Sequence, residues 1–135
     1  MVTLSLFVST LHAITLTVIV KGLQNKKGKL QVSLYNKEKS IPDKNLTKYY
    51  KTKRVAIAGD VVRIVFENLP KGRYAVSVFH DENDNHKVDK GWFMPKEGIG
   101  LSNFDTINLF RLPSFSNACF ELDHDKEIVV SLIYL

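Results

Sequence analysis

Hydrophobic and polar residues alternate along most of this chain, and helical periodicity is scarce. Alternation places every second side chain on one face, which is typical of strands that bury one face and expose the other. Seven segments show this pattern and are predicted to be strands: residues 14–22, 29–36, 53–59, 61–68, 72–80, 116–123 and 126–135.

Short polar turns separate three successive pairs of these segments. The turns read "LQNKKG", "LPKG" and "HD", in which Gly28, Pro70 and Gly72 supply backbone angles suited to a reversal. We therefore predict three hairpins, which pair residues 14–22 with 29–36, 61–68 with 72–80, and 116–123 with 126–135.

Residues 37–52 depart from the alternation. Pro42 and Asp43 suit the start of a helix, so one short helix at most is predicted between residues 40 and 52. The spacing of strands and turns predicts an all-β fold, an antiparallel β-sandwich of about seven strands that is immunoglobulin-like in architecture. An open barrel is the main competing architecture.

The composition agrees with one globular domain. The chain has 135 residues, of which 44% are hydrophobic and 24% charged. The single cysteine, Cys119, cannot form an internal disulfide, and its neighbours Ala118 and Phe120 indicate a thiol in or near the core.

The first 13 residues are apolar and end in alanine, which is too short a run to span a bilayer as a helix. They are predicted to be a signal peptide, residues 1–13, followed by one domain, residues 14–135. The protein is then expected outside the cytoplasm, in the periplasm or secreted. No Lys or Arg precedes the apolar run, and the alternative is a first strand at residues 4–8.

Positive charge is concentrated in two segments, residues 21–29 and 44–54, in a chain whose net charge is +5. Such clusters suit the binding of nucleic acid or another anionic polymer, here through Lys26, Lys27, Lys29 and the second cluster. No nucleic-acid fold signature accompanies them, so solvated turns are favoured and this function is kept as an alternative.

The segment "HDENDNHKVDKGWFMPKEG", residues 80–98, follows a strand and carries oxygen-bearing side chains at alternate positions. A tight loop can turn such oxygens inward, and calcium takes six to eight of them. We predict a calcium site with these ligands: Asp81, Asn83, Asn85, the Lys87 carbonyl, Asp89 and, as a distal ligand, Glu97.

The loop departs from the EF-hand pattern at two positions. His86 replaces the glycine of the sharp turn, and Trp92 replaces the bidentate glutamate, so calcium is expected to bind weakly. The alternative is a solvated turn, because Asp and Asn are good turn formers. Zinc is less favoured because the histidines lack zinc-site spacing.

Two further functions can be stated for this region. Trp92 and Phe93 are adjacent aromatic residues that suit contact with a carbohydrate or a protein surface, or else cover one end of the core. A hydrolase built from His80, Asp81 and a hydroxyl such as Ser102 is disfavoured, because no nucleophile motif accompanies these residues.

Three stretches, "FENLPKGRYAVSVFHDENDNHKVD", "GWFMPKEGIGLSN" and "PSFSNACFELD", resemble the bacterial family called domain of unknown function 2141. The resemblance extends over residues 14–135. It implies a small exported β-sandwich of unassigned function, similar to transthyretin-like accessory domains of secreted proteins. That similarity implies binding and not catalysis.

Overall fold

The computed structural model describes residues 13–84, 98–104 and 113–134. Within these ranges the chain forms strands β1 (Ile14–Lys21), β2 (Lys29–Tyr35), β3 (Lys51–Ala56), β4 (Val62–Leu69), β5 (Gly72–Asp81), β6 (Ile99–Leu101), β7 (Phe120–Leu122) and β8 (Lys126–Ser131), and helix α1 (Phe115–Ala118).

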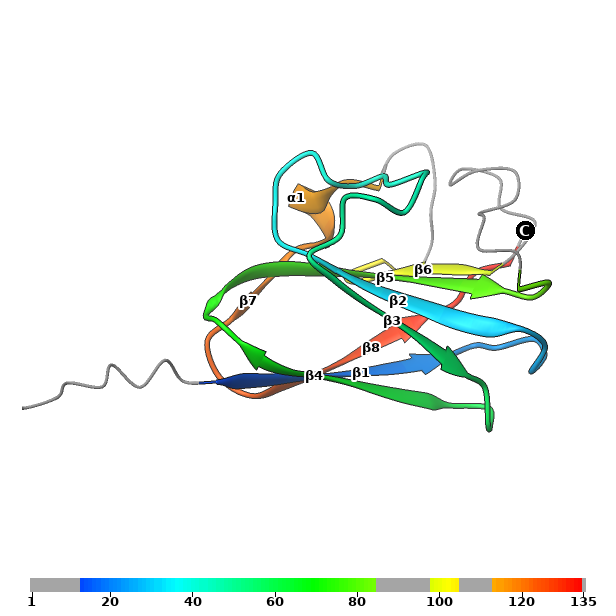
Figure 1. Ribbon diagram of the computed structural model, residues 1–135. Coiled ribbons are helices and arrows are strands. Elements are labelled where there is room, and N and C mark those ends of the chain that lie inside the picture. Colours follow the sequence, from blue (N-terminus) through cyan, green and yellow to red (C-terminus); the bar gives the residue numbers. More distant parts are fainter. Residues whose placement is uncertain (1–12, 85–97, 105–112, 135) are drawn as a thin grey trace, which may run out of the picture.

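The strands form two sheets that face each other across a shared core (Figure 1). The smaller sheet has the order β4-β1-β8, and the larger has the order β3-β2-β5-β6, with β7 paired to the start of β5. The predicted all-β sandwich is confirmed, and each predicted segment overlaps a strand, whereas β6 lies outside all of the predicted segments. One pair differs from the predicted antiparallel arrangement, because β1 and β8 run parallel.

The three predicted hairpins are wrong, because the chain crosses between the sheets at each predicted turn. β1 pairs with β4 and β8, whereas β2 pairs with β3 and β5. Likewise, β4 and β5 lie in different sheets, and so do β7 and β8. Alternation indicates which face of a strand is buried but not which strand lies beside it. A turn that reverses the chain within a sheet and one that crosses the sandwich therefore look alike in sequence.

The short helix lies at Phe115–Ala118 and not between residues 40 and 52 as predicted. Ser114 caps it by accepting a hydrogen bond from the backbone N–H of Asn117. In the earlier segment, Asp43 does accept bonds from two backbone N–H groups, but Leu46 has a φ of +52°. That left-handed residue makes the segment a turn, because right-handed helices do not contain it.

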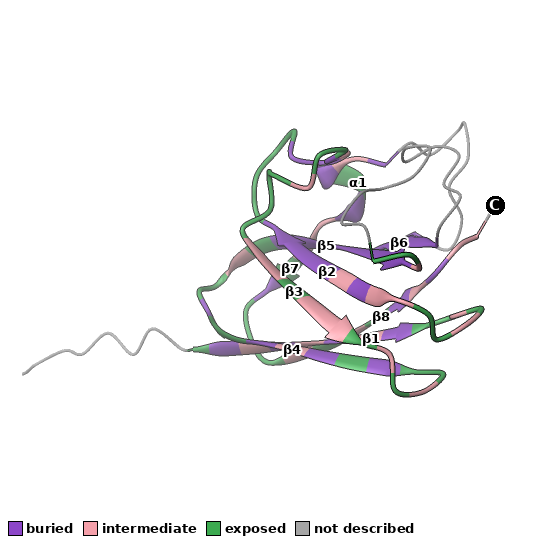
Figure 2. Ribbon diagram, turned by 45° about the vertical axis from the view of Figure 1, so that its right-hand side comes forward, coloured by how far each residue is buried: buried purple, intermediate pink, exposed green. Residues whose placement is uncertain are grey.

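The larger sheet buries both of its faces. The inner face packs on the smaller sheet, and the outer face carries a second core that includes Tyr35 and Phe79. Ile41 from the connection after β2 and Phe115 from α1 cover this second core. Figure 2 shows the result in β5, whose residues are buried from Tyr74 onwards. Among the residues that the structure describes, the outer face of the smaller sheet carries half-buried and exposed side chains and is open to solvent.

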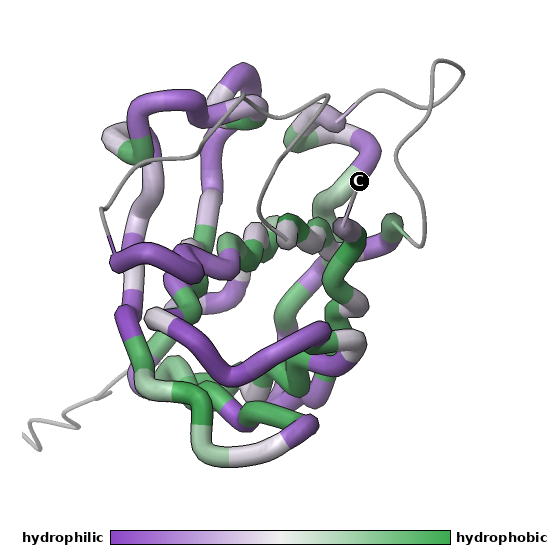
Figure 3. The backbone as a smooth tube through the Cα atoms, turned by 90° about the vertical axis from the view of Figure 1, so that its right-hand side faces the viewer, coloured by the Kyte–Doolittle hydropathy of each residue, from purple (hydrophilic) through white to green (hydrophobic). Residues whose placement is uncertain are grey.

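Hydropathy follows this architecture. Hydrophobic residues recur along the strands, and the connection between β2 and β3 is mostly hydrophilic (Figure 3). No helix in the described ranges is long and apolar enough to cross a membrane.

Candidate functional site

Two buried polar residues, His80 and Asp81, end strand β5 on opposite faces of the larger sheet. His80 continues the row of Val76 and Val78, which faces the smaller sheet, and Asp81 continues the row of Phe79 on the outer face. Both side chains are fully buried. Because successive residues of a strand point to opposite faces, these two side chains lie in different surroundings.

The Asp81 carboxylate meets a cation from strand β3. Nη2 of Arg54 lies 2.6 Å from Oδ2 of Asp81 and also bonds to Oδ1 of Asp84. Nη1 of the same side chain donates to the Gln31 amide oxygen at 3.2 Å. Burial lowers the pKa of Arg54, but its bonds to Asp84 and Asp81 outweigh burial and raise it. Two carboxylates at the end of β5 therefore converge on one positive charge.

The structure describes two of the six predicted calcium ligands. Asp81 is buried beside Arg54, and Asn83 is exposed in the turn that follows β5. Asp84 joins Asp81 at the same guanidinium group. The other four predicted ligands, Asn85, Lys87, Asp89 and Glu97, lie outside the described residues, as do Trp92 and Phe93.

In the described part of the chain, no group of three or more His, Cys, Asp or Glu side chains is placed to hold a metal ion. A calcium ion at the end of β5 would need further oxygen ligands besides Asp81 and its neighbours.

His80 is held from both sides of its ring. Nε2 lies 2.7 Å from the Lys27 carbonyl oxygen, and Nδ1 lies 2.6 Å from the Tyr134 hydroxyl. A carbonyl oxygen only accepts, so Nε2 carries a hydrogen and donates to Lys27, while Nδ1 and the Tyr134 hydroxyl share the second hydrogen bond. The pKa of Tyr134 is raised, chiefly by burial. The hydrogen bond from the backbone N–H of Gln24 opposes this increase, and the charge of Glu82 adds to it. His80 thus ties the β1–β2 connection to the C-terminal segment.

The residues of the alternative hydrolase do not form a triad. The Ser102 hydroxyl is buried, accepts from the Val76 N–H at 2.9 Å and donates to the Ala118 carbonyl at 2.7 Å. His80 bonds to Tyr134 and Lys27, and Asp81 lies on the opposite face of β5. These contacts give Ser102 a structural role, because its donor and acceptor capacities are used in joining β5, β6 and α1.

The basic cluster on β3 is divided between two faces of the sheet. Arg54 lies on the outer face with the carboxylates, whereas Lys53 pairs in register with the core residue Val32. The Lys53 ammonium donates to the Val65 carbonyl and lies 5.4 Å from the centre of the Phe66 ring. The cluster therefore does not present one continuous basic face, which weakens the case for an anionic polymer.

Cys119 lies at the margin of the second core, as predicted for a near-core thiol. Its sulfur is 2.8 Å from Nη2 of Arg73, a contact between residues 46 positions apart. The structure gives this pair a packing role at the junction of β5 and β7.

Sequence reasoning did not assign Arg54 or Tyr134 to this site, and it placed Arg54 only in the basic segment of residues 44–54. Each is far along the chain from its partner, 27 residues for Arg54 and Asp81 and 54 residues for Tyr134 and His80. No local spacing connects such pairs. A charged residue inside a strand of the alternating pattern was the one available signal for Arg54.

Comparison with known proteins gives a family and no activity. No curated protein and no solved structure matches this chain. Residues 18–130 match the model of a family described as uncharacterized proteins conserved in bacteria. The matched region runs from the middle of β1 to near the end of β8 and includes the site at the end of β5. The chain therefore belongs to the bacterial family called domain of unknown function 2141.

Proposed function

We propose that this protein is a non-enzymatic β-sandwich module that acts outside the cytoplasm by binding, with a loop after β5 that takes up calcium weakly. The observation that carries the calcium proposal is the convergence of Asp81 and Asp84 on one cation, Arg54. The two carboxylates therefore lie close together at the start of the loop, and carboxylate oxygens are among the ligands that calcium takes.

The same geometry argues for low affinity. Arg54 neutralises the two carboxylates, so a calcium ion has to share them with the guanidinium group or displace it. Trp92 also stands where the EF-hand pattern has its bidentate acid. Both reasons favour a Kd on the order of 10⁻⁴ to 10⁻³ M, the range of extracellular modules.

Calcium would connect the loop to binding. The proposed ligands Asp89 and Glu97 stand on either side of Trp92 and Phe93 in sequence. An ion bound by residues on both sides would fix these aromatic residues beside the end of β5. The proposed partner is a carbohydrate or protein surface, since aromatic side chains suit both.

The calcium proposal is tested by thermal melts and by calorimetric titration with calcium chloride. At 1 mM calcium, stability should exceed that in chelator by roughly 0.4 to 1.4 kcal/mol. Asp89→Asn should remove the increment, and Asp60→Asn, in an exposed turn elsewhere, should retain it. Asp81→Asn should lower stability even without calcium, because Arg54 loses a buried partner. Identical melting temperatures of the wild type in calcium and in chelator would contradict the calcium proposal and show that the loop is only a solvated turn.

The location outside the cytoplasm is supported by the apolar first 13 residues. Mass spectrometry of the protein from its native cell should find an N-terminus at or near Ile14. Recovery of the chain with Met1 intact from the cytoplasmic fraction would contradict export.

A further inference from the structure

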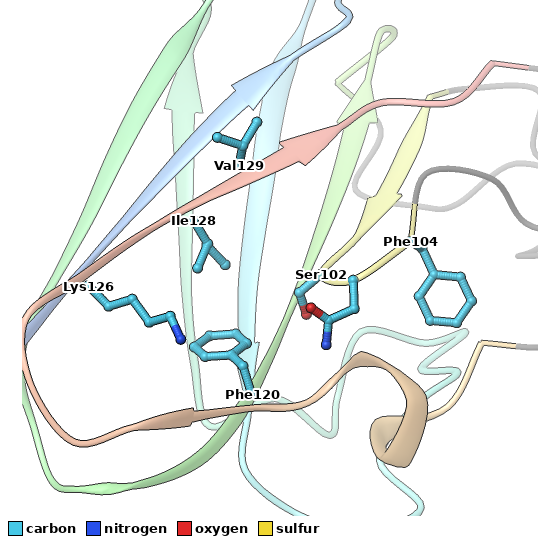
Figure 4. Close-up of a pocket in the computed structure, with 7 residues that line it drawn as sticks. Ser102, Phe104, Phe120, Lys126, Ile128 and Val129 are labelled. Atoms are coloured by element: carbon cyan, nitrogen blue, oxygen red, sulfur yellow. The ribbon is translucent and has the colours of Figure 1, made fainter.

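A pocket of about 340 Å³ opens at the side of the sandwich where β8 faces β7 and the end of β6 (Figure 4). It shares no residue with the site at the end of β5. Its volume lies within the range of small-molecule sites, roughly 300 to 1,000 Å³. The lining residues are Ser102, Asn103, Phe104, Phe120, Lys126, Ile128 and Val129.

The pocket places one cation beside apolar walls. Lys126 pairs in register with Leu16, a core residue, so its side chain leaves β8 on the inner face. Its ammonium group lies 5.5 Å from the centre of the Phe120 ring (Figure 4). No carboxylate in the described part of the chain forms an ion pair with it. A positive charge next to a ring and an aliphatic wall suits an anion with an apolar body.

The polar floor of the pocket is fixed by the fold. The Ser102 hydroxyl donates to the Ala118 carbonyl, and Nδ2 of Asn103 donates to the carbonyls of Ala118 and Cys119. These donors are already used inside the protein. Lys126 is therefore the group in this lining that is placed to attract an anion.

The apolar side of the pocket comes from separate elements. Ile128 follows Lys126 on the inner face of β8, and Phe104 follows β6 (Figure 4). The Ile128 side chain points toward Phe120, whereas Val129 points to the other side of β8. Ile128 and Phe120 are partly buried residues at the edge of the main core. They leave apolar surface that a ligand can cover.

We propose that this pocket binds a small organic carboxylate with an apolar body. The carboxylate lies at the Lys126 ammonium group, and the apolar part lies against Phe120, Ile128 and Phe104. The binding is non-covalent and does not depend on calcium, so it stands or fails independently of the function proposed above.

The test uses 4-fluorobenzoate as the probe and 4-fluorobenzyl alcohol as its neutral counterpart, both followed by fluorine NMR. The folded wild type should bind the carboxylate saturably. Lys126→Met, which keeps the apolar stem, should weaken carboxylate binding about fivefold, the effect of a partly exposed ion pair. Lys21→Met, an exposed lysine on β1, should leave it unchanged. The alcohol should bind wild type and Lys126→Met equally.

Amide chemical shifts of the wild type give a readout that does not depend on how a variant folds. Saturating 4-fluorobenzoate should shift residues 102, 103, 120, 126 and 128 most. Carboxylate binding that is equal in wild type and Lys126→Met would overturn the proposal. Absence of saturable binding, or shifts centred on another surface, would do so as well.

Discussion

At the scale of single residues, a buried hydrogen bond fixes the connection after β2 to the larger sheet. The Tyr35 hydroxyl donates to Oδ2 of Asp43 at 2.9 Å, and both residues are buried. Asp43 also accepts from the backbone N–H groups of Thr47 and Lys48. Burial raises the pKa of Tyr35, and the charge and hydrogen bond of Asp43 raise it further. The fold therefore depends on the neutral form of this tyrosine.

Tyr35→Phe is predicted to cost about 1 to 3 kcal/mol at pH 7, because Asp43 loses a partner inside the protein. The raised pKa of Tyr35 determines whether its contribution to stability rises or falls with pH. The stability that the Tyr35 hydroxyl contributes is complete below the ordinary tyrosine pKa of about 10, and is lost as pH rises through the folded pKa. Urea unfolding should show that the difference in the free energy of unfolding between wild type and Tyr35→Phe is smaller at about pH 11 than at pH 7. A difference that grows at high pH would refute this role.

At the scale of elements, the connections that cross the sandwich hold both the sheets and the site together. The connection from β1 to β2 brings the Lys27 carbonyl to His80 and packs Gly28 against the end of β5. Gly28 has a φ of +64°, and a Cβ there would lie 1.9 Å from the Asp81 carbonyl oxygen. Glycine is required at this position both for its backbone angle and for the close approach of the two chains.

Gly28→Ala should therefore destabilise the fold by about 2 kcal/mol or more, through strain and displacement of Asp81. Gly59→Ala is the matched control, because the nearest atom to its Cβ would be 3.9 Å away. It should change stability by no more than about 0.5 kcal/mol. Equal denaturant midpoints for the two variants would show that the approach at Gly28 relaxes without cost.

At the scale of the whole molecule, one lysine points inward at each open side of the sandwich. Lys53 on β3 reaches the Val65 carbonyl of β4, and Lys126 on β8 reaches the Phe120 ring of β7. In the described part of the chain, β3, β4 and β8 are edge strands. A charge that faces inward on an edge strand hinders pairing with another molecule, because pairing would bury it.

Lys53→Val should increase self-association relative to wild type, because it removes this charge from the β3 edge. Lys44→Val, an exposed substitution in the connection before β3, serves as the control for lost charge alone. Sedimentation velocity over a range of concentrations should show larger species for Lys53→Val only. Unchanged sedimentation of Lys53→Val would mean that the edge is protected by other means.

The sequence by itself determined the approximate positions of seven strands, the residues of each that face the main core and the position of the polar loop, but neither β6 nor helix α1. Alternation is a local property, since each side chain takes its face from its own place in the strand. Residues 72–80 were predicted as a strand leading into Asp81, and β5 ends at that residue. The family resemblance was likewise carried by local motifs and is confirmed over residues 18–130.

Only the tertiary structure decided which strands pair and what surrounds the site. The parallel pairing of β1 with β8, the second core beneath α1 and the contacts of Arg54 and Tyr134 all join residues far apart in sequence. Backbone hydrogen bonds between strands are alike for every residue type, so sequence does not label a partner. The burial of a charged group explains why Asp81 has a partner from another part of the chain. Asp81 needs a cation once it leaves water, and the chain meets that need with an arginine from another strand.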